Sequence, residues 1–266
     1  MGINVMLSGG GVKGCYTYGF FKELYKQYPD YPINKVYGVS VGAINSMPIL
    51  TKKMHVLDKF WNDPLMHPFD IISNDWDPTK NSIRDRVHAF VKNGSLLKSL
   101  KSEPFVEFLE SNREDMTTVR RKLVVISYNK VTLKPAYHRC IDPITTFESI
   151  AGSSRFPGLF DSIGYTNIDG CFVDLDSIIA KYRDQKWLYI DLQKRSRMVS
   201  SKKIRIFSPK VSNIPGVNSA MCLLSNRASI DNLIENGRAD ANAYINQVQI
   251  MQPDNAVNGD TSETLV

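Results

Sequence analysis

The chain has 266 residues and a mass of 30.1 kDa, enough for one large domain with a substantial core. Its mean hydropathy is slightly negative and no apolar run reaches the length of a membrane span, which argues against an integral membrane protein. The formal net charge is +6, and a basic surface attracts nucleic acid or anionic lipid. We expect one domain over residues 1–248, in a cytoplasmic protein that is soluble or peripherally bound to membrane.

The first predicted element is a buried strand over residues 3–7, which leaves no room for a signal peptide, so we expect no secretion by that route. The loop that follows reads SGGGVKG from Ser8. Its glycines at 9, 11 and 14 fit G-x-G-x-x-G, the pattern of loops that hold a dinucleotide pyrophosphate. A helix follows and ends before Pro29. The pattern therefore predicts a loop whose backbone amides face a negative charge.

The second predicted strand, residues 35–39, leads into a G-x-S-x-G sequence that runs from Gly38 through Ser40 to Gly42. Between a strand and a helix, this sequence forms a sharp turn that exposes the serine hydroxyl for nucleophilic attack. A dinucleotide-binding unit would instead end this strand in an acidic residue. We therefore expect the glycine-rich loop to face an oxyanion formed at Ser40, and dinucleotide binding is the alternative enzyme class.

The remaining elements continue the alternation of strands and helices. Residues 51–109 are predicted mostly helical, with an ordered loop over 60–78 whose bulky apolar side chains form either a flap over the substrate or part of the core. Further predicted elements are strands over 122–129, 162–168, 187–192 and 203–209, an amphipathic helix over 230–248 and a polar, disordered tail over 249–266. This order predicts an α/β protein.

A serine nucleophile needs a group that accepts its proton. No histidine follows His138, so the chain order Ser, Asp, His is disfavoured. Asp169 and Gly170 come directly after the predicted strand 162–168, and the Asp169 carboxylate is the candidate base; a plain Asp-Gly turn is the alternative interpretation. The four cysteines and four histidines are scattered without metal-ligand spacing, so we expect no metal.

These motifs together resemble those of the patatin-like phospholipases, whose relatives include the cytosolic phospholipases A2. Gly9 to Gly14 matches the family's G-G-G-x-[R/K]-G, Gly38 to Gly42 its G-x-S-x-G, and Asp169-Gly170 its D-G-[G/A]. A small-residue segment over 151–160 echoes a further family feature, and the resemblance covers residues 3–244. Cys171 stands where the family has Gly or Ala in the third motif.

The resemblance implies a three-layer α/β/α fold with a central, mostly parallel sheet, and a lipid acyl hydrolase without a cofactor. Its substrate would be a phospholipid or other acyl ester at a membrane surface. In this scheme Ser40 is the nucleophile and Asp169 the general base, the amides of Gly10 and Gly11 hold the oxyanion, and Gly9, Lys13 and Gly14 support the loop. A non-catalytic lipid-binding module on the same fold is the alternative.

Two surface features complete the predictions. Basic runs over 119–123 and 194–204 are interpreted as solvated surface, because no nucleic-acid motif accompanies them, and we expect no nucleic-acid partner. At the C-terminus, Thr264 and Val266 are spaced as in peptides that bind PDZ domains, and a frayed polar tail is the alternative.

Overall fold

The computed structural model describes residues 2–62, 110–154, 166–210 and 227–250. Their strands form one sheet in the order β4-β3-β2-β1-β6-β7, and β5 also pairs with β3. The pairs β1–β2, β2–β3, β1–β6 and β6–β7 are parallel, whereas β4 and β5 run antiparallel to β3. The strands are β1 (Ile3–Leu7), β2 (Ile33–Val39), β3 (Leu123–Asn129), β4 (Lys134–Arg139), β5 (Asn167–Asp169), β6 (Trp187–Ile190) and β7 (Ile204–Phe207).

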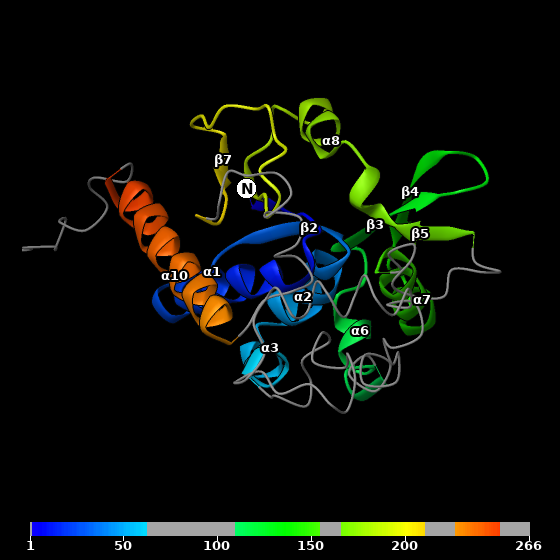
Figure 1. The fold of residues 1–266 in the computed structure, drawn as a ribbon, viewed down its shortest axis with the longest axis horizontal. Coiled ribbons are helices and arrows are strands. Elements are labelled where there is room, and N and C mark those ends of the chain that lie inside the picture. The colour runs from blue at the N-terminus through cyan, green and yellow to red at the C-terminus, as the bar shows by residue number, and fades with distance from the viewer. Residues whose placement is uncertain (1, 63–109, 155–165, 211–226, 251–266) are drawn as a thin grey trace, which may run out of the picture.

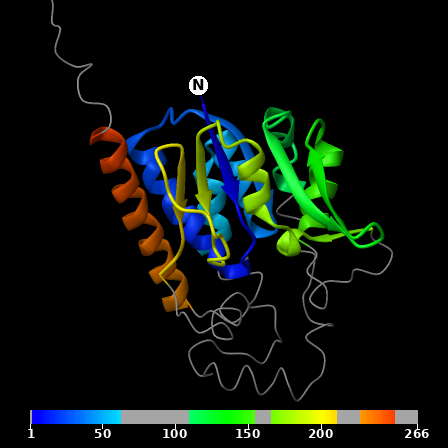
Figure 2. The ribbon, with the colours of Figure 1, turned by 90° about the horizontal axis from the view of Figure 1, so that it is seen from above.

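The helices of the described residues cover both faces of this sheet. They are α1 (Gly14–Gln27), α2 (Val41–Thr51), α3 (Met54–Asn62), α6 (Asp115–Thr118), α7 (Pro143–Ser153), α8 (Leu175–Lys181) and α10 (Arg227–Ile250), with 3-10 turns η1 (Gly11–Lys13) and η4 (Gly170–Phe172). Figure 1 shows α8 on the face opposite to α1, α2 and α10, and Figure 2 shows the same arrangement from above. The predicted three-layer α/β/α fold with a mostly parallel sheet is confirmed.

The central strand β1 is buried on both faces. Val5 and Leu7 belong to the core shared with α1, α2 and α10, while Met6 belongs to the core shared with α8, and none of the three is exposed to solvent. Successive side chains of a strand point to opposite faces, so a strand covered on both sides is continuously apolar. This explains why β1 reads as an apolar run rather than an alternating one.

Glycine allows α1 and α10 to pack closely. A Cβ at Gly19 would lie 2.2 Å from the carbonyl oxygen of Ile234, and one at Gly237 would lie 2.2 Å from that of Tyr16. Real Cβ atoms do not approach a carbonyl oxygen so closely, so any larger residue at either position would push the helices apart. The long C-terminal helix is thereby held against the first helix of the fold.

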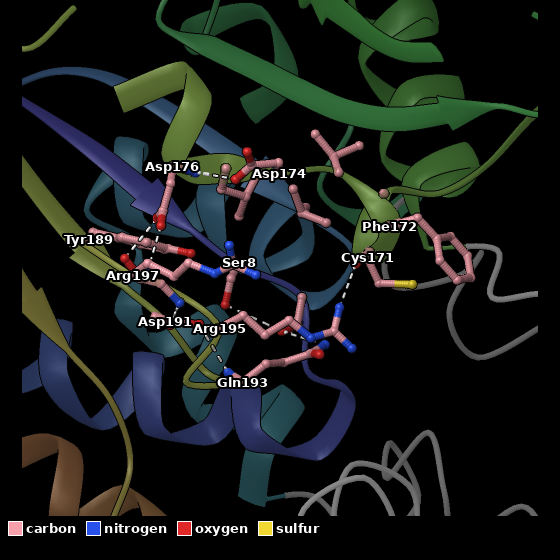
Figure 3. Close-up of a pocket in the computed structure, with 16 residues that line it drawn as sticks. Ser8, Cys171, Phe172, Asp174, Asp176, Tyr189, Asp191, Gln193, Arg195 and Arg197 are labelled. Carbon is pink, nitrogen blue, oxygen red and sulfur yellow. Dashed lines mark hydrogen bonds between the residues drawn. The ribbon is translucent and has the colours of Figure 1, made fainter. Parts of the chain in front are cut away.

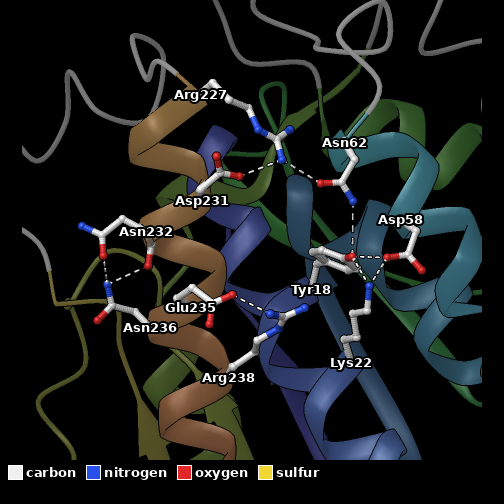
Figure 4. Close-up of polar contacts among 10 residues, drawn as sticks. All are labelled: Tyr18, Lys22, Asp58, Asn62, Arg227, Asp231, Asn232, Glu235, Asn236 and Arg238. Carbon is white, nitrogen blue, oxygen red and sulfur yellow. Dashed lines mark hydrogen bonds and ion pairs between the residues drawn. The ribbon is translucent and has the colours of Figure 1, made fainter.

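Polar contacts fix the start of α10 to the end of α3 (Figure 4). The Arg227 guanidinium donates to the carbonyl oxygen of Trp61 at 3.0 Å and to the Asn62 side-chain oxygen at 2.8 Å. The Asn62 amide donates in turn to the Tyr18 hydroxyl, which donates to the Asp58 carboxylate. Cationic groups stabilise the carbonyl end of a helix, so Arg227 satisfies the last turn of α3 from a distant part of the sequence.

The sequence predicts the parallel strands well and the antiparallel ones less well. The strands predicted over 3–7, 35–39, 122–129, 187–192 and 203–209 are confirmed as β1, β2, β3, β6 and β7, with ends that differ by a few residues. Strand β4 and helices α7 and α8 were not predicted. Helix α3 continues to Asn62, into the loop predicted over 60–78; the rest of that loop, Cys222 and the C-terminal residues 251–266 with their PDZ-like ending lie outside the described residues.

Candidate active site

Ser40 occupies a sharp turn between β2 and α2, as the sequence predicts. Its backbone φ is 53° and its ψ is −126°, a conformation that non-glycine residues rarely adopt. A Cβ at Gly38 would lie 2.5 Å from the Ser46 hydroxyl oxygen, and one at Gly42 would lie 2.3 Å from the Leu7 carbonyl oxygen. Both glycines of G-x-S-x-G are therefore required by close packing, and the strain at Ser40 is typical of a functional turn.

A buried serine that the sequence analysis missed holds this turn. The backbone N–H of Ser40 donates to the Ser153 hydroxyl oxygen at 2.9 Å, and the Ser153 hydroxyl donates to the carbonyl oxygen of Ile126 at 2.5 Å. Ser153 is the last residue of α7 and is not exposed to solvent. It ties the strained turn to β3. Its only signal in the sequence was its place in the small-residue segment over 151–160.

The register of two strands on β3 brings Asp169 to Ser40. Strand β2 ends on β3 with Val39 opposite Ile126, and β5 ends on it with Asp169 opposite Ser127. Since β4 occupies the other edge of β3, β2 and β5 share one edge and meet end to end. The last residue of β5 therefore lies beside the residue that follows β2, and the Ser40 hydroxyl is close enough to the Asp169 carboxylate to lower its pKa.

Burial controls the charge of Asp169. The carboxylate is 2% exposed, and this desolvation raises its pKa to about 6. The Ser40 hydroxyl and the backbone N–H and thiol of Cys171 oppose the rise, and this N–H donates to the carboxylate at 2.8 Å. Gly170 passes so close to β3 that a Cβ there would lie 2.5 Å from the Ile126 carbonyl oxygen. The carboxylate is thus mostly ionised at neutral pH but more basic than an exposed aspartate.

The glycine-rich loop lies against Ser40. A Cβ at Gly9 would lie 3.0 Å from the Ser40 Cβ, and one at Gly10 would lie 2.8 Å from the Leu192 Cβ. Gly11 has a φ of 54°, in the left-handed region that favours glycine, and begins η1. The amides at the start of a helix have no acceptor within it, so the amides of Gly10 and Gly11 are suited to an external anion.

The neighbouring residues anchor this loop. The Ser8 hydroxyl accepts from the backbone N–H of Leu192 at 2.8 Å, and the Gln193 side chain donates to the Gly9 carbonyl oxygen at 3.2 Å. Lys13 is 1% exposed, so its side chain is buried and supports the loop from inside the protein rather than from the surface. A Cβ at Gly14 would lie 2.3 Å from a Val41 methyl group. The start of α1 therefore packs against the start of α2 too closely for any side chain larger than that of glycine.

A cavity of about 720 Å³ opens beside the loop and beside Gly170 (Figure 3). Charged side chains of both signs line it. Arg195 donates to the Cys171 carbonyl oxygen at 2.7 Å, and the buried carboxylate of Asp191, whose pKa is raised by burial, accepts from the backbone N–H of Ser196 at 2.8 Å. The sequence analysis placed no site residue at Asp191 or Arg195 and interpreted the basic run over 194–204 as solvated surface.

Three further observations bear on the class of protein. Among the described residues, no group of three or more His, Cys, Asp or Glu side chains is placed to hold a metal ion. The described helices include none with the length and apolar character needed to cross a membrane. Strand β2 leads into Ser40 rather than into an acidic residue, so the feature that a dinucleotide-binding unit requires at this position is missing.

A three-layer α/β/α fold with a serine on a strand-turn-helix and a glycine-rich loop beside it is typical of hydrolases that act on acyl esters. The chain belongs to the patatin-like phospholipase family, because that family's model, described as Patatin-like phospholipase, matches residues 5–191. At the level of the family, this is a lipid hydrolase fold.

Several solved structures are similar to this chain. VipD from Legionella pneumophila has a TM-score of 0.42 and 12% sequence identity, over 88% of this chain and 67% of that chain. A heterodimeric ExoU–SpcU complex from the type III secretion system of Pseudomonas aeruginosa has a TM-score of 0.40 and 14% identity, over 92% of this chain and 51% of that chain. The chain thus spans about half the length of that protein. No curated protein matches the chain.

Proposed function

We propose that this protein is a lipid acyl hydrolase that cleaves acyl esters of phospholipids or related lipids through Ser40 and Asp169. The observation that carries the proposal is the position of the Ser40 hydroxyl beside the buried Asp169 carboxylate, where β2 and β5 meet on β3. The family supports a lipid substrate at the level of class. The particular residues and the reaction below are our proposal.

Acylation begins when the Ser40 oxygen attacks the carbonyl carbon of the ester and Asp169 takes the hydroxyl proton. A carboxylate with a pKa of about 6 suits this role, since it is ionised at neutral pH and accepts a proton more readily than an exposed aspartate. When the tetrahedral intermediate collapses, the ester C–O bond breaks and Asp169 returns the proton to the leaving alcohol. The acyl group then remains on Ser40.

The amides of Gly10 and Gly11 stabilise the oxyanion of the tetrahedral intermediate. The loop is within contact of Ser40 at Gly9, and η1 begins at Gly11. Helix α2 begins at Val41, so the positive end of its dipole also lies at the nucleophile. Loss of one such donor typically lowers kcat by about 10²- to 10³-fold.

Deacylation repeats the proton transfer with water. A water molecule attacks the acyl-Ser40 carbonyl carbon while Asp169 takes one of its protons, and collapse releases the carboxylic acid and returns the proton to the Ser40 oxygen. The charged cavity beside Gly9 and Gly170 accommodates the polar part of the substrate, because Val39 and Gly170, the neighbours of Ser40 and Asp169 in the chain, line it together with charged groups of both signs. We propose that the reaction takes place in the cytoplasm at a membrane surface, with a peripherally bound enzyme.

Hydrolysis of a phospholipid and of a short soluble ester by the wild type and by Ser40→Ala and Asp169→Asn variants tests the proposal. We expect both variants to lose activity by several orders of magnitude. The exposed residues Ser177 and Asp184 provide matched controls as Ser177→Ala and Asp184→Asn, which should retain it. Equal activity in the wild type and the two variants of the candidate dyad would refute the mechanism.

Covalent labelling separates this enzyme from a non-catalytic lipid-binding module on the same fold. A fluorophosphonate probe reacts with an activated serine, so we expect it to label the wild type at Ser40 and to leave Ser40→Ala unlabelled. Lipid binding without labelling and without hydrolysis would favour the binding module instead.

A further inference from the structure

The turn between β3 and β4 exposes two apolar side chains. Val131 is 73% exposed and Leu133 is 69% exposed. The turn is nevertheless ordered by Asn129, whose side-chain oxygen accepts from the backbone N–H groups of Val131 at 3.0 Å and Thr132 at 2.9 Å. The two apolar groups are therefore presented to solvent by a defined structure.

Leu133 also adopts an unfavourable backbone conformation. Its φ is 56°, in the left-handed region where glycine or asparagine costs much less than a branched apolar residue. A leucine here gains nothing from burial, since most of its surface is exposed. Folding alone therefore does not explain a leucine at this position. Residues whose type does not suit their backbone conformation are concentrated at functional positions.

The charged residues near the turn in the sequence are all basic. Lys130 and Lys134 flank the apolar pair, and both are exposed. From residue 116 to residue 141 the sequence contains no aspartate or glutamate. Apolar side chains flanked by basic ones are typical of segments that bind the interface of an anionic membrane, where the lysines contact head groups and the apolar groups enter the acyl boundary.

The turn also lies at the edge of the sheet that carries the candidate active site. It continues from the carboxyl end of β3, where Ser127 pairs with Asp169, and Figure 1 shows the β3–β4 hairpin extending from the sheet beside β5. The ring of Phe172 is 58% exposed and lies 6.1 Å from the ring of Tyr128, measured between centroids. Exposed apolar surface therefore also lies directly beside Asp169 and Gly170.

We propose that the turn of residues 130–134 is an interfacial anchor that docks the protein on an anionic lipid surface. Val131 and Leu133 enter the acyl boundary, and Lys130 and Lys134 contact the head groups. The inference rests on the proposed function in one respect. Ser40 follows the carboxyl end of β2, and the turn follows the carboxyl end of the neighbouring parallel strand β3, so docking through the turn brings lipid esters to the side of the sheet where Ser40 lies.

Sedimentation of the full chain with vesicles tests the anchor without any turnover. The vesicles are phosphatidylcholine alone and phosphatidylcholine mixed with phosphatidylserine. The first variant is Val131→Ser with Leu133→Gly, chosen because glycine accepts a φ of 56° without strain, so the turn is retained; thermal melting checks the fold. The second is Lys130→Gln with Lys134→Gln. Val199→Ser, at a valine 84% exposed on another loop, is the matched control.

We expect the apolar variant to lose at least about tenfold in partition to mixed vesicles. The lysine variant should lose about fivefold per charge on mixed vesicles and little on phosphatidylcholine. Val199→Ser should bind as the wild type does. Unchanged binding of the turn variants, an equal loss in Val199→Ser, or no binding by the wild type would overturn the anchor.

The two proposals fail separately. A protein that binds vesicles through the turn but hydrolyses no ester would refute the proposed reaction and leave the anchor intact. A protein that hydrolyses a soluble ester through Ser40 but does not bind vesicles through the turn would refute the anchor alone. Capture of nucleic acid or of a protein by the wild-type turn, without vesicle binding, would also overturn it.

Discussion

Substitution of Ser153 by alanine removes two hydrogen bonds at the candidate nucleophile, one buried and one partly buried. The Ser40 N–H loses its acceptor and the Ile126 carbonyl oxygen loses a donor. A buried polar group left without a partner costs about 1–3 kcal/mol, so the free energy of unfolding should fall by about that amount. The side-chain volume changes little, so packing contributes a small part of this loss.

The same change should lower the rate of catalysis. Ser40 is held at a φ of 53°, and Ser153 supplies the hydrogen bond that ties this conformation to β3. When the turn relaxes, the hydroxyl moves away from Asp169, and a displacement of about 1 Å at a reacting group costs about 10²-fold. We expect kcat for a soluble ester to fall by about that factor, with a much smaller change in KM.

Urea denaturation and steady-state hydrolysis of a soluble ester measure the two effects. Ser149→Ala is the matched control, because Ser149 lies on the same helix and its hydroxyl donates to the carbonyl oxygen of Thr145, one turn earlier in that helix. If Ser153→Ala and Ser149→Ala lose the same stability and the same activity, Ser153 does not position the nucleophile. A loss of stability without a loss of kcat would show that Ser40 keeps its conformation unaided.

Two further predictions concern the charge of Asp169 and the contact of α1 with α10. Burial favours the neutral carboxyl and raises its pKa to about 6, so kcat/KM for a soluble ester should rise with pH through about 6 and level off above it; a rise centred near pH 4 would contradict the role of burial. Gly19→Ala places a methyl group 2.2 Å from the Ile234 carbonyl oxygen and should lower the free energy of unfolding by about 1–3 kcal/mol or more, as measured in urea. Gly152→Ala is its control, because the nearest atom would be 3.8 Å away and alanine stabilises a helix by about 0.5–1 kcal/mol; equal losses in both variants would refute the packing argument.

Local patterns predicted those parts of the site that are contiguous in the sequence. The turn at Ser40 needs five consecutive residues, and the glycines at 38 and 42 are required by neighbours within a few ångströms. The loop at Gly9 to Gly14 is local in the same sense. The carboxylate at Asp169 was found through its Asp-Gly motif, but its distance from Ser40 depends on how β5 pairs with β3, which no local pattern encodes.

The parts that were missed depend on contacts between distant segments. Ser153 acts on Ser40 across the fold, and Arg195 and Asp191 reach the cavity only because β6 lies next to β1. Helix α7 did have a local signal. Asp142 accepts from the backbone N–H of Thr145 at 2.9 Å and is followed by a proline in the first turn, a combination that predicts the start of a helix.

Strands β2 and β5 meet end to end on β3. For this reason the distance between Ser40 and Asp169 does not depend on the length of the chain that connects them. Hydrogen bonds along one strand fix where Ser40 and Asp169 stand, so the segments that connect α3 to β3 and α7 to β5 do not set their spacing. Insertions or deletions in those connections would leave the two side chains together. A shift of β5 by a single residue along β3 would turn Asp169 to the opposite face of the sheet. Family members can therefore differ greatly in size around this pair, whereas the three residue pairs that join β5 to β3 admit no change of register.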